Sequence, residues 1–312
     1  MKQLPCIFIS IFVTVTLSCN HTRPVDVNDQ GVKIAYTDSK IGDTTLLFVH
    51  GWCINKGYWS NQVTYFSKKY RVVTFDMPGF GQSGKNRTDW STEAYGRDVD
   101  SVISQLKLKN VILIGHSMAG DIVLQAAVNN PNVIGLVGVD NFKNVGHLQN
   151  RAEKKDFDDA IAALKHNFKY VAIPYFKQDL FSKTTSLAIQ KRILNDVTHA
   201  DTTIAAASME QGNSFNELAK LHQLKRKLYL INSDVHPADT TGFIRNKIPY
   251  QLLYIHGTGH FPMIEDPVDF NLLLENVIEN IQKDNSKTIS KATDHTGISP
   301  YVSQLPYHIT VS

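Results

Sequence analysis

Cysteine is scarce in this chain, and its placement limits what the thiols can do. The 312 residues include three cysteines, Cys6, Cys19 and Cys53. The first two lie in or beside an apolar segment at the N-terminus, so a domain that begins after this segment holds a single cysteine. A disulfide needs two thiols, and we therefore expect none within the folded domain.

An excess of charge of one sign is also absent. Lysine and arginine number 32, aspartate and glutamate 29, and the net charge is +3. The charges are scattered, so the sequence indicates no nucleic-acid partner. No group of His, Cys and Asp residues has the spacing of metal ligands, and no Gly-x-Gly-x-x-Gly motif follows the first strand. We therefore predict neither a metal nor a nucleotide cofactor.

The apolar run at residues 7–17 is too short to cross a bilayer. Lys2 precedes it and Leu17-Ser18-Cys19-Asn20 follows, which resembles a bacterial lipoprotein signal. This resemblance implies a signal over residues 1–18, a lipid on Cys19, a linker over residues 19–30 and a membrane-anchored or periplasmic protein. Simple secretion and an uncleaved anchor helix are the alternatives.

The most informative stretch surrounds Ser117. Residues 111–114 are aliphatic and mostly β-branched, as in a strand buried on both faces of a parallel sheet, and residues 122–128 read as a helix. A strand that becomes a helix so quickly must turn sharply, which exposes the hydroxyl group of Ser117 at the tip. Unpaired N–H groups at the start of the helix suit a developing oxyanion.

Strands alternate with helices along the rest of the chain. Short apolar runs indicate strands at residues 32–37, 45–49, 70–75, 133–139, 227–231 and 251–255. Amphipathic stripes predict a helix that begins at Ser91 or Thr92 and a closing helix over residues 270–281, with a short helix near residues 241–246. This alternation predicts one α/β domain, residues 31–283, whose mostly parallel sheet is flanked by helices.

Residues 141–225 depart from the alternation, since they have helical periodicity and no strand pattern. An insertion of this size between two late strands is expected at the carboxyl edge of the sheet, where open α/β sheets bind ligands. We therefore predict an all-helical cap over the site. Residues 284–312 are polar without a regular period, and we predict a mobile tail there.

Four motifs occur in a fixed order and carry a resemblance to a known family. They are His50-Gly51-Trp52, residues 76–83, residues 115–120 and residues 259–267. The chain resembles the α/β-hydrolase fold superfamily, in its single-domain esterase-like branch with a helical cap. The second glycine of the usual Gly-x-Ser-x-Gly motif is Ala119 here.

The resemblance implies a role for several residues. Ser117 matches the nucleophile and His260 the general base, while Trp52 and Met118 match the oxyanion-hole residues through their backbone N–H groups. Elementary chemistry agrees, because a serine hydroxyl needs a base to take its proton. Three other polar residues near these motifs, His50, His116 and Cys53, are interpreted as structural. Four aromatic residues are candidates for an apolar pocket or for plain core: Phe142, Tyr175, Phe176 and Phe261.

The acid that would orient His260 is the least determined part of the site. Asp234 follows the strand before the last, where the superfamily usually places its acid, and its interval to His260 favours it. Asp140, at the end of the strand before the cap, is the alternative, and Asp239 is a third candidate.

These residues predict a serine hydrolase that acts by acyl transfer on a small carboxylic ester. The alternatives are amide or C–C hydrolysis by the same residues and a binding module that senses a small ligand under the cap. An aspartate nucleophile, as in epoxide and haloalkane hydrolysis, is disfavoured because position 117 is serine.

Overall fold

A computed structural model describes residues 27–296 of the chain. Within these residues, a seven-stranded sheet has the order β3-β5-β4-β6-β7-β8-β9. The edge strand β3 runs antiparallel to β5, and the other neighbours are parallel. The strands are β3 (Tyr36–Asp38), β4 (Thr45–Val49), β5 (Arg71–Phe75), β6 (Val111–His116), β7 (Val133–Val139), β8 (Leu228–Ser233) and β9 (Tyr250–Ile255).

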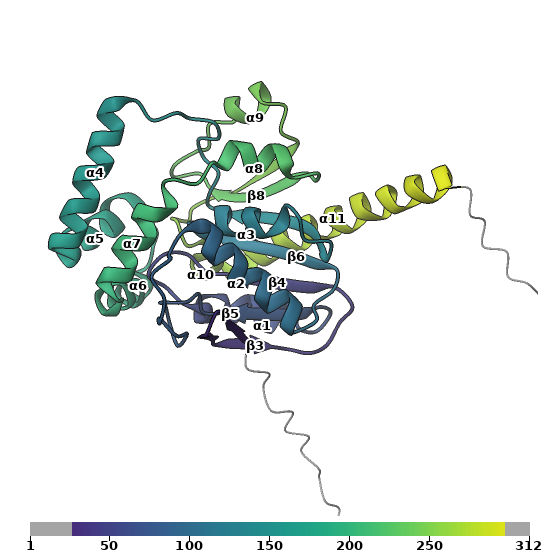
Figure 1. Ribbon diagram of the computed structural model, residues 1–312, viewed down its shortest axis with the longest axis horizontal. Helices are drawn as coiled ribbons and strands as arrows, with labels where there is room; N and C mark the ends of the chain where they lie inside the picture. Colours follow the sequence, from purple (N-terminus) through teal and green to yellow (C-terminus); the bar gives the residue numbers. More distant parts are fainter. Residues whose placement is uncertain (1–26, 297–312) are drawn as a thin grey trace, which may run out of the picture.

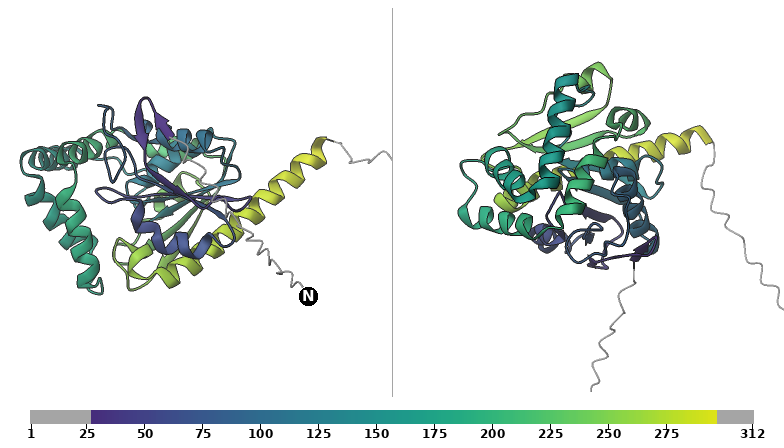
Figure 2. Two further views of the ribbon diagram at one scale, coloured as in Figure 1. Left: turned by 90° about the horizontal axis from the view of Figure 1, so that it is seen from below. Right: turned by 60° about the vertical axis from the view of Figure 1, so that its left-hand side comes forward.

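Helices cover both faces of this sheet (Figures 1 and 2). On one face lie α2 (Thr92–Gln105) and α3 (Ala119–Ala127), and on the other α1 (Ser60–Phe66) and α11 (Pro267–Thr296). The side chain of Ser91 accepts a hydrogen bond from the Ala94 N–H and caps α2, as the sequence predicts. The apolar stripe of α2 is buried against the core. Both faces of the central strands are therefore removed from water, which explains their continuous apolar sequences.

The segment between β7 and β8 is helical, and it lies beside the sheet at its carboxyl edge (Figure 1). It contains α4 (Arg151–His166), α5 (Phe168–Tyr175), the π-helical turn Phe176–Leu180, α6 (Leu187–His199), α7 (Thr202–Gly212) and α8 (Glu217–Gln223). Several of these helices begin with a side-chain cap: the Asn150 amide oxygen, for example, accepts from the N–H groups of Ala152 and Glu153. We call residues 141–225 the cap.

The N-terminal boundary differs from the prediction. β1 (Val27–Asp29) pairs with β2 (Val32–Ile34) in an antiparallel hairpin, so the predicted linker over residues 19–30 is wrong at its end. Val27 is fully buried, a contact that a three-residue strand does not reveal by its pattern. The predicted signal and Cys19 lie outside the described residues. Among residues 27–296, no helix has both the length and the apolar character needed to cross a membrane.

The C-terminal boundary differs as well. Helix α11 continues to Thr296, so the prediction of a mobile tail from residue 284 is wrong for residues 284–296. The sequence misleads here because the apolar stripe stops at Ile281 while the backbone stays helical. A pair of opposite charges four residues apart, Lys283 and Glu279, favours the helix where the apolar stripe ends.

Three short helical elements lie between the longer helices and strands. A 3-10 turn, Lys56–Trp59, precedes α1, with the Asn55 side chain accepting from the Gly57 N–H. The short helix α9 (Thr241–Arg245) lies between β8 and β9. Pro262 begins α10 (Pro262–Glu265), where its missing N–H costs no hydrogen bond.

Candidate active site

Ser117 lies in the sharp turn between β6 and α3. Its φ of 55° is in the left-handed region, which is strained for a residue with a Cβ atom. Its N–H donates to the carbonyl of Val139 in the neighbouring strand at 2.9 Å. A Cβ atom on Gly115 would lie 2.4 Å from the Ala119 carbonyl oxygen, so glycine is needed where strand and helix approach. Ala119, in place of the usual second glycine, is fully buried in this packing.

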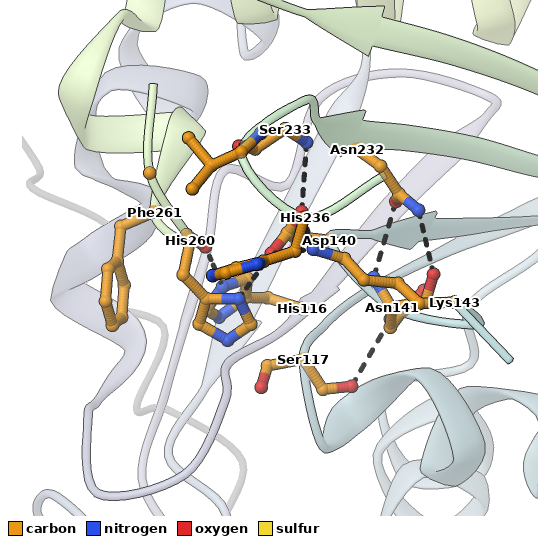
Figure 3. Close-up of polar contacts among 12 residues, drawn as sticks. His116, Ser117, Asp140, Asn141, Lys143, Asn232, Ser233, His236, His260 and Phe261 are labelled. Atoms are coloured by element: carbon orange, nitrogen blue, oxygen red, sulfur yellow. Dashed lines mark hydrogen bonds and ion pairs between the residues drawn. The ribbon is translucent and has the colours of Figure 1, made fainter. Parts of the chain in front are cut away.

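His260 lies in the loop after β9, and its ring points toward both Asp140 and Ser117 (Figure 3). The Nδ1 atom of His260 donates a hydrogen bond to Oδ2 of Asp140. The backbone N–H of His260 donates to the Leu180 carbonyl in the cap at 2.8 Å. Ser117 and His260 line the same cavity. The ring is thus held on one side by a carboxylate while its other nitrogen remains for Ser117.

Asp140, at the end of β7, is 3% exposed. Besides His260, its carboxylate accepts the Ser233 N–H at 2.9 Å and the Lys143 ammonium group at 3.0 Å. Burial raises the pKa of Asp140, but the charges and hydrogen bonds of His260 and Lys143 outweigh it and hold the pKa below its ordinary value. Asp140 is therefore ionised, and an ionised acid keeps the Nδ1 proton of His260 in place.

The preference for Asp234 as the partner of His260 is wrong in this structure. Asp234 forms an ion pair with His256 at 2.7 Å, and its side chain is 41% exposed. β8 continues through Ser233, whose N–H bonds Asp140, so the chain turns outward at Asp234. The third candidate, Asp239, accepts the Thr241 N–H at 2.9 Å instead. Asp140, the alternative from the sequence, occupies the position of the acid.

The histidines and the cysteine that were interpreted as structural are buried. Nε2 of His50 accepts the Met77 N–H at 2.9 Å, so its Nδ1 donates to the Gly51 carbonyl. His116 donates from Nε2 to the His260 carbonyl at 2.7 Å, and burial lowers its pKa to about 3. Cys53 is 3% exposed, and burial raises its pKa. A buried neutral thiol is a poor nucleophile.

Trp52 and Met118 lie at the same edge of the sheet, because β4 and β6 are parallel neighbours. Met118 precedes the first residue of α3, where backbone N–H groups have no acceptor within the helix. The indole Nε1 of Trp52 donates to the Ala205 carbonyl in α7 at 2.9 Å, and its ring stacks on Phe176. The cap therefore anchors the Trp52 side chain and leaves only its backbone for an oxyanion.

The cavity beside Ser117 has a volume of about 240 Å³. Three of the four aromatic candidates from the sequence, Tyr175, Phe176 and Phe261, line it, whereas Phe142 is buried outside its wall. Phe157, Leu180 and Met209 add apolar surface from the cap. Thr92, Asp121 and Ser208 add polar groups to the same wall. The cavity thus has an apolar wall with a few polar groups, as small-molecule sites commonly have.

With this geometry in view, comparison with known proteins decides the family. The sequence model described as alpha/beta hydrolase fold matches residues 44–267. The chain belongs to this family.

The names of two proteins similar to this chain indicate different roles. A hydrolase of (E)-2-((N-methylformamido)methylene)succinate from Acinetobacter baylyi is 29% identical over 171 residues, covering 54% of this chain and 64% of that protein. The karrikin insensitive 2 receptor IA of Petunia hybrida is 25% identical over 172 residues, covering 47% of this chain and 63% of that protein. The matches thus span less than two thirds of these relatives' lengths.

A solved structure confirms the fold of this α/β-hydrolase family member over most of its length. A thermophilic esterase from Thermogutta terrifontis superposes with a TM-score of 0.70 at 18% identity, covering 82% of this chain and 97% of the esterase. At this identity the likeness establishes the fold alone.

Two charged residues of this α/β-hydrolase site escaped the sequence analysis. Lys143 bonds both carboxylate oxygens of Asp140, at 3.0 and 3.1 Å. Glu265 accepts the N–H groups of Gly259 and Phe261, on both sides of His260, and the Thr185 hydroxyl group of the cap at 2.6 Å. Glu265 belongs to a quoted motif, so its position gave a signal, whereas Lys143 becomes informative only once the structure places Asp140 against His260.

Proposed function

We propose that this protein is a serine hydrolase that cleaves a small carboxylic ester by acyl transfer. The observation that carries the proposal is the contact between the buried Asp140 and His260, which lines one cavity together with Ser117. A histidine held by a carboxylate has the tautomer that a general base needs. Ser117 in a strained turn presents its hydroxyl group to that base.

Each residue has a step in the proposed reaction. The Ser117 oxygen attacks the ester carbonyl while Nε2 of His260 takes the hydroxyl proton. The negative oxygen of the tetrahedral intermediate accepts hydrogen bonds from the backbone N–H groups of Trp52 and Met118. His260 then gives its proton to the leaving alcohol, and the same residues activate water to hydrolyse the acyl-enzyme. Asp140 stays ionised throughout and stabilises the charged imidazole.

The cavity supports a short or medium ester. Its volume of about 240 Å³ and its aromatic walls suit an apolar group of limited length. The cap supplies much of this wall through Phe157, Tyr175 and Met209, so cap residues set the preferred length. Amide and C–C hydrolysis use the same residues and remain the alternative reactions.

A fluorophosphonate probe tests the nucleophile. The mature protein should be labelled on Ser117, and Ser117→Ala should abolish labelling. Ser101→Ala is the matched control, because Ser101 lies on α2 and bonds Asp29 away from the cavity. A series of p-nitrophenyl esters of increasing acyl length then measures the size of the pocket. Folded wild-type protein that resists the probe would contradict the proposal.

The likeness to a petunia protein named as a receptor favours a second candidate, a sensor of a small ligand under the cap. A sensor needs binding without rapid turnover. The two candidates separate in a steady-state assay: repeated turnover of the esters supports the hydrolase, whereas one acylation event without recovery supports the sensor.

A further inference from the structure

A pair of carboxyl groups lies beside the proposed nucleophile and has no role in the reaction. Asp121 lies in the first turn of α3 and lines the cavity that contains Ser117. Glu217, the first residue of α8 in the cap, lies close enough for the charge of Asp121 to raise the pKa of its carboxyl group. Burial raises the pKa of both groups, so the pair retains a proton near neutral pH. Two carboxyl groups that share one proton carry one negative charge.

In the part of the chain that the structure describes, the cavity wall beside this pair provides no cationic side chain. No lysine or arginine is found among the described residues that line the cavity. The Oδ1 atom of Asp121 is enclosed, and within the described part of the chain no N–H or O–H group bonds it. A buried negative charge without donors is costly, which leaves the pair ready to accept hydrogen bonds from a ligand.

A second polar group in the same wall also lacks a partner. Thr92 is 5% exposed and lines the cavity. Its Oγ1 atom faces Gly212, which also lines the cavity. A Cβ atom placed on Gly212 would lie 3.6 Å from this oxygen. Among residues 27–296 no hydrogen bond to this hydroxyl group is found, and its oxygen is open to the cavity, so it can bond a ligand there.

We propose that Thr92 and the Asp121–Glu217 pair form a subsite for an ammonium group on the substrate. The proposal rests on the proposed function and narrows it to esters whose acyl chain carries a protonated amine. An ammonium group supplies both the missing donors and the missing charge, and one of its hydrogens can bond Thr92. Asp121 lies in the first turn of α3, four residues after Ser117, and both residues line one cavity, which suits a short acyl chain.

Two p-nitrophenyl esters of matched shape test the subsite. The 3-aminopropanoate carries an ammonium group where the butanoate carries a methyl group. For each ester, kcat/KM is divided by its spontaneous hydrolysis rate at pH 7, and fluorophosphonate labelling counts the active sites. In the wild type we expect this corrected kcat/KM to be at least about tenfold higher for the amino ester than for the butanoate. In Asp121→Asn the ratio of the two values should fall by about tenfold.

Two further variants make the comparison specific. Glu217→Gln should also lower the preference, since it removes the other half of the pair. Asp100→Asn should leave it unchanged, because Asp100 is a half-buried acid of α2 that bonds Asn130 outside the cavity. Equal rates for the two esters in the wild type, or a preference that survives Asp121→Asn, would overturn the subsite.

A binding measurement separates this proposal from the proposed function. Butylamine is titrated calorimetrically into the wild type and Asp121→Asn. We expect about tenfold weaker binding by the variant. If neither ester is turned over and Ser117 is not labelled, the hydrolase proposal fails, while the butylamine result still decides the subsite. Equal butylamine affinity in both proteins would reject it.

Discussion

Two aspartate–histidine pairs lie at the carboxyl edge of the sheet, and they differ in almost everything except their composition. Asp140 follows β7 and pairs with His260, whereas Asp234 follows the neighbouring β8 and pairs with His256. In the first pair the side chains are 1% and 14% exposed, and in the second 41% and 78%. The first pair lies next to Ser117, and the second faces solvent.

The difference shows that the environment, and not the residue types, makes a candidate catalytic pair. Asp140 accepts a backbone N–H and an ammonium group in addition to the imidazole, so it stays charged while buried. Asp234 makes its ion pair in water, where such a contact contributes little. Four predictions test this conclusion, and the first two compare the pairs directly.

The largest difference is expected between the two histidines. His260→Ala should lower kcat for a p-nitrophenyl ester by about 10⁶-fold, because Ser117 loses its base. His256→Ala should leave kcat within about twofold of the wild-type value, since a substitution at an exposed position rarely disturbs the folded structure. Steady-state kinetics on both variants measure this. Similar losses in the two variants would refute the assignment of the base.

The two aspartates come next. Asp140→Asn should lower kcat by about 10⁴-fold, because an amide no longer holds the proton of His260 on Nδ1. Asp234→Asn should keep nearly full turnover. Circular dichroism on both variants controls for folding. A loss in Asp234→Asn with normal turnover in Asp140→Asn would restore the sequence-based preference for Asp234.

Replacing Lys143 should have a smaller effect, which is seen in the pH dependence of kcat/KM. Its positive charge contributes to the lowered pKa of Asp140 and competes with His260 for the carboxylate. In Lys143→Met the pKa of Asp140 should rise toward its ordinary value, so as pH falls activity should be lost at a higher pH than in the wild type. The pH–rate profiles of wild type and variant measure this shift.

Lys40→Met is the matched control for this experiment, because Lys40 pairs with Asp38 on the edge strand. It should leave the profile unchanged. A profile that does not move in Lys143→Met would show that Lys143 only supports the turn around Asp140.

The sequence predicted the strand–turn–helix at Ser117, the position of His260 and the helical cap because these follow from local patterns. Apolar runs, small residues at a tight turn and helical periodicity are visible over a few residues. The sequence-based preference for Asp234 was wrong, since Asp140 and Asp234 both follow strands and no local pattern separates them. The choice between them depends on where β8 ends and on the Ser233 N–H. The Asp121–Glu217 contact joins distant segments, so no local pattern reveals it.

The smallest effect concerns the stability contributed by the exposed pair. His256 holds the pKa of Asp234 below its ordinary value, mainly through a side-chain hydrogen bond. A lowered pKa stabilises the folded state above the ordinary carboxyl pKa, and this stabilisation is lost as pH falls. Because solvent screens the pair, a double-mutant cycle of Asp234→Asn and His256→Ala at pH 6 should give a coupling of at most about 1 kcal/mol in unfolding free energy. Urea denaturation measures it, and a coupling above about 2 kcal/mol would mean that this pair is as enclosed as Asp140 and His260.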